Sequence, residues 1–176
     1  MLTTVENVHL YVDTELSDSV LEAKLRGLEL MIRAYTHNNF QERNIRSVCK
    51  SDGNKIIGIH EFLGIGDTIE ISGSFYNNGI YTICEIEDNS ALVDRPIFSE
   101  EYFTVTKVVY PENVVLGALG LLDWDVNRRD KVGVQSETIS RHSVTYFNMD
   151  GGSGNSAMGF PSSLLGFLEP YRKARF

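Results

Sequence analysis

The stretch Gly66–Glu87, GDTIEISGSFYNNGIYTICEIE, decides the fold because its side chains alternate between apolar and polar. Within 67–72, Ile69 and Ile71 share one face, and the alternation resumes after the turn at Asn77–Gly79. A period of two on both sides of an Asn-Gly turn is typical of a β-hairpin. The stretch therefore predicts two antiparallel strands that share one apolar face.

Similar short runs lie on both sides of this hairpin. KIIGI at 55–59, SALVD at 90–94 and TVTKVVY at 104–110 are rich in Ile, Val, Thr and Tyr, and Gly, Asn and Asp separate them. The segment Ser47–Tyr110 is thus expected to hold about five strands. Five short strands with one apolar face usually close into a small barrel, because closure removes exposed edges.

Patterns of helical period lie outside this segment. Thr3 or Thr4 is expected to cap a short first helix, and apolar residues at spacings of three and four predict a longer helix between Val20 and Tyr35. Pro111 suits the first turn of a third helix, ENVVLGALGLLDWDVN, which is apolar almost all round. Such a helix has to be covered on more than one face, and another subunit is one source of that cover.

The rest of the chain predicts two short extended pieces, a Gly-rich loop and a last helix. The extended pieces are expected at 138–139 and 143–147, and the loop at 148–159. Pro161 and the serines after it are expected to begin the last helix.

These patterns together predict an α+β fold. We expect a helical core of about four helices, formed by 1–46 and 111–176, with a small β-barrel inserted at 47–110. A short extended segment precedes the C-terminal helix. The two ends of the inserted segment are expected to lie close together, as a tolerated domain insertion requires.

The net charge of −8 is unevenly distributed along the chain. Between Ser47 and Tyr110 there are four basic residues against ten acidic ones. A surface that binds phosphate needs the opposite sign. No window approaches the roughly 18 apolar residues of a membrane span, and the opening residues lack a basic leader region. We therefore expect no membrane partner and a protein that stays in the compartment where it is made.

The sequence contains no recognisable catalytic or metal-binding pattern. Cys49 and Cys84 are the only cysteines, and we expect them to be buried free thiols in a reducing cytoplasm. The four histidines are scattered, and the glycines of 151–159 lack the Gly-Lys-Ser/Thr ending of a phosphate loop. We therefore expect no enzymatic activity, no cofactor and no metal.

Three separate parts of the chain carry a pattern of specific residues in a fixed order. The first reads LTT-x-E-x-V-x-x-Y, the second YT-x-x-x-F, and the third Gly-x-x-Ser-Glu-x-Ile-x-x-x-Ser-Val-x-Tyr. This order resembles the head-to-tail connector, or adaptor, proteins of long-tailed bacteriophages. The matching residues are Leu2, Thr3, Thr4, Glu6, Val8 and Tyr11; Tyr35, Thr36 and Phe40; and Gly133, Ser136, Glu137, Ile139, Ser143, Val144 and Tyr146.

The resemblance implies a structural virion protein, made in the host bacterial cytoplasm and located in the neck at the head–tail interface. It implies a ring of identical copies under the portal protein, with the portal's twelve-fold symmetry. The ring extends the DNA channel, lets genomic DNA pass without specific binding, and docks the next neck or tail-completion protein. In many members of the family the chain passes directly from one flanking helix to the next, so 47–110 resembles an insertion. We interpret this insertion as a part that decorates the virion or contacts a neighbour.

Portal and inter-subunit contacts are expected in two segments. The first is the matching segment, with Gly133, Ser136, Glu137, Ile139, Ser143, Val144 and Tyr146, and the second has Phe167, Tyr171, Arg172, Lys173, Arg175 and Phe176. An aromatic anchor with flanking cations is a frequent interface hot spot. The alternative is that the apolar side of the last helix completes the core of its own subunit and the final residues fray.

A second hypothesis makes the barrel a binding module for a saccharide, a peptide or single-stranded nucleic acid. Five of its aromatic residues could form an exposed platform. The favoured alternative is that most of these five rings fill the barrel or its mouth, because burial is the commoner habit of aromatic rings. They are Phe75, Tyr76, Tyr81, Tyr102 and Phe103. The acidic charge of the segment disfavours nucleic acid.

Overall fold

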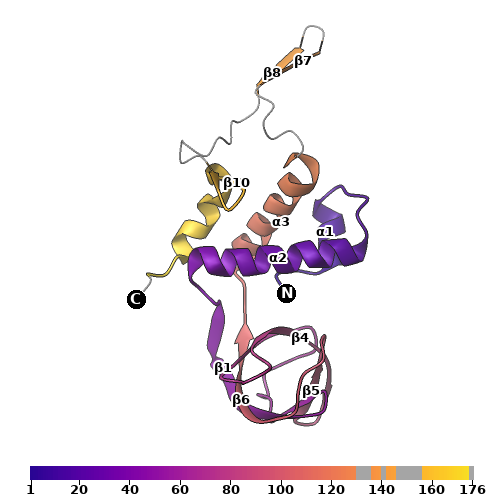
Figure 1. Cartoon of the computed structure of the whole chain (residues 1–176), viewed down its shortest axis with the longest axis vertical. Helices are drawn as coiled ribbons and strands as arrows, with labels where there is room; N and C mark the ends of the chain where they lie inside the picture. Colours follow the sequence, from indigo (N-terminus) through magenta and orange to yellow (C-terminus); the bar gives the residue numbers. More distant parts are fainter. Residues whose placement is uncertain (130–135, 140–141, 146–155, 175–176) are drawn as a thin grey trace. The chain divides into compact units, whose positions relative to one another are not determined.

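The computed structural model describes residues 1–129, 136–139, 142–145 and 156–174. The chain divides into two compact units (Figure 1). The barrel unit comprises Met1 and Asn39–Tyr110, and the helical unit comprises Leu2–Asn38 and Pro111–Phe176.

The barrel unit is a closed sheet of six antiparallel strands, drawn as a ring of strands in Figure 1. In spatial order these are β1 (Gln41–Asp52), β2 (Lys55–Ile57), β5 (Ser90–Val93), β4 (Gly79–Glu87), β3 (Thr68–Ser72) and β6 (Glu100–Val108), and β6 pairs again with β1. Closure leaves no unpaired edge that could template aggregation.

The predicted hairpin is confirmed as β3 and β4. Ile69 lies opposite Tyr81, and Ile71 lies opposite Gly79. Ile69, Ile71 and Ile83 are at most 1% exposed, so the alternation seen in the sequence is that of a strand pair with one buried face. The connection between the strands begins at Gly73, whose φ of 72° favours glycine.

The expected fold, a helical core carrying an inserted barrel, is wrong. The six-stranded barrel is the dominant core of the described residues. The main omission is β1, which begins at Gln41 rather than after Arg46. Its first half carries no buried apolar residue, so it lacks the period-two signal. The ladder with β6 holds it instead, for example through the pairing of Gln41 with Val108.

The helical unit contains α1 (Val5–Tyr11), α2 (Asp18–Thr36), α3 (Glu112–Asn127) and the 3₁₀ helix η2 (Ser162–Tyr171). The Thr4 hydroxyl accepts a hydrogen bond from the backbone N–H of Asn7 and caps α1, as Thr3 or Thr4 was expected to do. Helix α2 buries the apolar stripe that its spacing predicts, including Leu21, Leu25 and Ile32 at 0% exposure.

The described part of the helical unit also contains two small two-stranded sheets. β7 (Ser136–Ile139) pairs with β8 (His142–Thr145), and β9 (Ser156–Ala157) pairs with β10 (Phe160–Pro161). The first pair covers most of the two extended pieces that the sequence predicts. Most of the predicted Gly-rich loop lies outside the described residues.

Helices α3 and η2 approach closely at Gly117. A Cβ atom at this position would lie 2.4–2.5 Å from three ring atoms of Phe167. Only glycine therefore allows the Phe167 ring to lie against α3. Leu165 and Leu168 of η2 are at most 1% exposed. The apolar side of η2 thus covers one face of α3.

Candidate interaction sites

The described residues offer no metal centre and no membrane span. They contain no group of three or more His, Cys, Asp or Glu side chains arranged to hold a metal ion. Within the same residues, no helix is both long and apolar enough to cross a bilayer. Both cysteines are free, but the expectation that both are buried is wrong, because Cys84 is exposed. Burial raises the pKa of the Cys49 thiol, which disfavours its reactive thiolate form.

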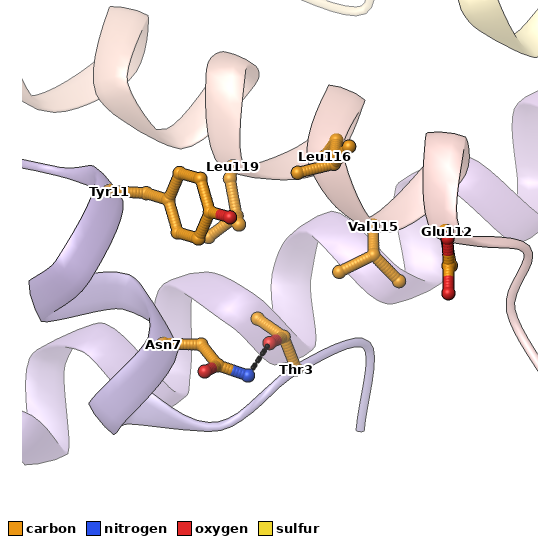
Figure 2. Close-up of a pocket in the computed structure, with 7 residues that line it drawn as sticks. All are labelled: Thr3, Asn7, Tyr11, Glu112, Val115, Leu116 and Leu119. Atoms are coloured by element: carbon orange, nitrogen blue, oxygen red, sulfur yellow. Dashed lines mark hydrogen bonds between the residues drawn. The ribbon is translucent and has the colours of Figure 1, made fainter.

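A groove lies between α1 and α3 in the helical unit (Figure 2). It has a volume of about 310 Å³. Its lining residues are Thr3, Asn7 and Tyr11 on one side and Glu112, Val115, Leu116 and Leu119 on the other. Tyr11 is 64% exposed and Leu116 is 52% exposed, whereas Leu119 at the base is 4% exposed.

The local sequence explains why this groove stays open. Helix α1 is only seven residues long and buries Val8, so Tyr11 at its last turn is left on the surface. Figure 2 shows the Tyr11 ring beside Leu119, and the Asn7 amide donates to the Thr3 hydroxyl at 3.1 Å. Leu116 belongs to α3, whose sequence is apolar almost all round, and its side chain is left on the surface. Such a groove suits an apolar side chain of a partner.

A second surface lies on the loops at one end of the barrel. Phe75 and Tyr76 in the β3–β4 loop and Phe98 in the β5–β6 loop are 89%, 73% and 67% exposed. The ring centroids of Phe75 and Tyr76 are 6.4 Å apart, and those of Tyr76 and Phe98 are 5.9 Å apart. These three residues form a contiguous cluster of rings, called the aromatic platform below.

A buried asparagine joins the two loops beneath this platform. Asn77 is 1% exposed. Its Nδ2 donates to the Phe98 carbonyl at 2.9 Å, and its Oδ1 accepts from the Phe98 backbone N–H at 2.8 Å. The Ser51 hydroxyl also donates to the Phe98 carbonyl, at 2.7 Å. A paired amide of this kind fixes the backbone of both loops, because breaking it leaves buried polar groups unsatisfied.

The carboxylate of Glu100 completes the base of the platform. It accepts hydrogen bonds from the Phe75 backbone N–H at 2.6 Å, from Asn77 Nδ2 at 3.1 Å and from the Ser74 hydroxyl. The hydrogen bond from Ser74 lowers the pKa of the Glu100 carboxyl most, and those from the Phe75 backbone and Asn77 add to it. The charged form of Glu100 therefore holds the loop that carries Phe75.

Of the five aromatic residues named in the binding-module hypothesis, two are buried and three are exposed. Tyr81 is 8% exposed and Phe103 is 0% exposed, so these two fill the barrel as the favoured interpretation holds. That interpretation is wrong for Phe75, Tyr76 and Tyr102, the last being 69% exposed. Sequence reasoning also missed Phe98, since its place beside Tyr76 depends on the long-range bond to Asn77.

The first expected contact segment is only partly described. Ser136, Glu137 and Ile139 lie in β7, and Ser143 and Val144 lie in β8. Glu137 pairs with Val144 across this ladder. Gly133 and Tyr146 lie outside the described residues. Among the described residues, β7 and β8 pair with each other and with no further strand.

The second expected contact segment makes bonds within its own unit. The Tyr171 hydroxyl donates to Asn113 Oδ1 at 2.7 Å, and the Lys173 backbone N–H donates to the Thr36 carbonyl at 2.8 Å. The Arg172 guanidinium lies 5.2 Å from the centroid of the Tyr35 ring. Tyr171 is therefore attached to the first turn of α3, and Arg172 and Lys173 lie against the end of α2.

Of the remaining residues of that segment, one is packed within the helical unit and two are not described. Phe167 lies against Gly117, and Arg175 and Phe176 lie outside the described residues. The Tyr35 hydroxyl donates to Glu169 at 2.9 Å, and this bond is the main cause that lowers the pKa of the Glu169 carboxyl. Tyr35, one of the motif residues, thus helps to attach η2 to α2.

Comparisons with known proteins give no family. No protein-family model matches the chain, and none of the curated proteins matches it. The connector resemblance therefore rests on the quoted residues alone.

Proposed function

We propose that the protein is a structural virion component, a head-to-tail connector that forms a ring under the portal. In this role it extends the DNA channel and provides a docking platform for the neck or tail. The proposal starts from the order and spacing of the three motifs. It is supported by surfaces of the helical unit that need a neighbour to cover them.

The groove between α1 and α3 is the observation that carries the proposal. It leaves Tyr11 and Leu116 mostly exposed in a helical unit of modest size. In a ring, each subunit presents one surface to the copy ahead and a different surface to the copy behind. A groove on one face, filled by an apolar side chain of the next copy, is an interface of this heterologous type.

The hairpin of β7 and β8 supports the same proposal. It contains the most specific of the three motifs, and among the described residues its strands pair only with each other. An isolated two-stranded hairpin is at best marginally stable in water. Contact with the portal or with a neighbouring copy would stabilise this strand pair, and this supports a role of the motif residues at an interface.

The charge of the chain fits a channel through which DNA moves freely. A net charge of −8 and an acidic barrel offer few phosphate contacts, and phosphate contacts are the main source of non-specific affinity for DNA. We therefore expect no electrophoretic shift of double-stranded DNA at low salt. A retained complex at that ionic strength would contradict this part of the proposal.

Variants of two exposed leucines test the role of the groove. Leu116→Glu places a charge in the groove, and Leu30→Glu is the matched control, because Leu30 is 61% exposed on α2 and does not line the groove. Both side chains are more than half exposed, so both variants are expected to fold. We expect Leu116→Glu to abolish co-sedimentation with the portal ring and Leu30→Glu to preserve it. Equal attachment of the two variants would remove the groove from the interface.

A further inference from the structure

The three rings of the aromatic platform are exposed and do not fill the core of the barrel. Phe75, the most exposed of its residues, is 89% exposed, yet the loop beneath it is fixed by Asn77 and Glu100. We propose that the platform binds an arginine-bearing, positively charged segment of a protein partner. This inference concerns the barrel unit and does not depend on the connector proposal.

The platform is already organised for binding. The Asn77 amide and the Glu100 carboxylate hold the backbone of both loops, so little backbone entropy is lost when a partner covers the rings. An aromatic side chain buries about 150–250 Å² and has only two rotatable angles. Three adjacent rings therefore supply enough apolar area for the centre of a peptide-sized interface.

The net negative charge of the barrel unit favours a cationic partner. The segment Asn39–Tyr110 contains six basic residues against eleven acidic ones. Asp52 precedes Gly53, whose backbone N–H donates to Ser99 Oγ at 2.8 Å, and Glu101 follows Glu100. Within the described part of the chain, the exposed carboxylates of Asp52 and Glu101 have no hydrogen bond or ion pair. They are free to pair with a partner's cations.

Arginine fits this combination of rings and carboxylates better than lysine. The planar guanidinium stacks on a ring face and donates hydrogen bonds from its edge at the same time. The protein uses this geometry itself, because the Arg95 guanidinium lies 4.5 Å from the centroid of the Tyr81 ring in the same barrel. A neutral saccharide carries no cation to pair with the carboxylates, and the negative charge of nucleic acid would be repelled by them.

Fluorescence polarisation with a labelled peptide tests the proposal on the full-length protein. The probe is a hexapeptide of alternating arginine and serine, and its matched control replaces each arginine with uncharged citrulline. We expect the arginine peptide to bind and the citrulline peptide to bind at least tenfold more weakly. Phe75→Ser is expected to weaken binding of the arginine peptide at least tenfold, because it removes the most exposed ring.

Two further variants control for folding and charge. Phe62→Ser removes a ring that is 66% exposed elsewhere on the barrel unit and should leave peptide binding unchanged. Glu101→Gln should weaken binding several-fold and make it less sensitive to salt. Circular dichroism should show the same folded signal for all three variants, since each substitutes an exposed side chain.

Several outcomes would overturn the proposal. One is the absence of binding by the arginine peptide up to about 1 mM, a weak limit for any specific contact. Equal binding by Phe75→Ser and the parent protein would move the site elsewhere. Equal binding of the citrulline peptide would show a merely apolar surface. Binding of a neutral oligosaccharide that is lost in Phe75→Ser, without peptide binding, would identify a glycan site. None of these outcomes bears on attachment to the portal.

Discussion

The close packing of η2 on α3 makes a quantitative prediction for Gly117→Ala. Alanine is favoured over glycine in a helix interior by about 1 kcal/mol. At Gly117 this gain is opposed, because the new Cβ would lie 2.4–2.5 Å from the Phe167 ring, against about 3.5–4.0 Å for an ordinary carbon contact. Overpacking of this kind costs about 1–3 kcal/mol.

Gly120→Ala is the matched control on the same helix. A Cβ at Gly120 meets nothing within 4 Å, so this variant should gain the full helix propensity. The free energy of unfolding of Gly117→Ala is therefore expected to fall about 1–3 kcal/mol below that of Gly120→Ala. In urea this corresponds to a midpoint lower by roughly 1 M.

Tryptophan fluorescence is a suitable assay because Trp124 is the only tryptophan. It lies on α3, with its ring centroid 5.4 Å from that of Phe160, so its emission reports on the helical unit. Shortening the opposing side chain with Phe167→Leu should recover part of the loss in the double variant with Gly117→Ala. Equal midpoints for Gly117→Ala and Gly120→Ala would show that α3 and η2 do not pack as described.

Three further predictions concern the barrel and the C-terminal segment. Phe103→Ala should destabilise the protein by about 3–5 kcal/mol because Phe103 is fully buried, whereas Tyr102→Ala should change stability by less than about 0.5 kcal/mol; similar thermal midpoints in circular dichroism would contradict this. Because the folded pKa of Glu100 is lowered, its contribution is present above the ordinary value of 4.5 and is lost as pH falls through the folded pKa. The difference in thermal midpoint between the parent protein and Glu100→Gln should therefore shrink below about pH 4.5, and a constant difference would show that the carboxylate is not responsible. Removal of Arg175 and Phe176 should leave the circular dichroism spectrum unchanged and weaken portal attachment at least tenfold, and unchanged attachment would place the portal contact elsewhere.

The parts of the fold that could be predicted are those with a strong local pattern. The alternation around Ile69 and Ile71 identifies the β3–β4 hairpin, and the spacing of Leu21, Leu25 and Ile32 identifies α2. Each pattern reflects one buried face of one element. Such signals do not depend on the rest of the chain.

The parts that could not be predicted depend on long-range pairing. The first half of β1 is polar except for Ile45 and is held by β6, so its own sequence shows no alternation of a strand. Without this strand the barrel looks smaller and appears secondary to the helices. This is why the expected fold gave the helices the larger role.

The candidate sites also divide into a part that the sequence indicated and a part that it could not indicate. The apolar sequence of α3 led us to expect that another subunit covers part of this helix, and Leu116 is its most exposed apolar residue. The aromatic platform could not be assembled from sequence, because the link from Asn77 to Phe98 crosses two loops. Exposure of Phe75 and Tyr76 also runs against the usual burial of aromatic rings.

Native mass spectrometry with and without the portal tests the proposed connector function most directly. The chain has a mass of 19.8 kDa, so each bound copy gives a resolvable mass increment. At low micromolar concentration we expect a monomer or weak oligomers alone, because in the proposed assembly contact with the portal completes the interface. With the portal we expect one copy of the chain for each portal subunit. An unchanged portal mass after mixing would contradict the connector function, and a salt-resistant ring of the protein alone would contradict portal-dependent assembly.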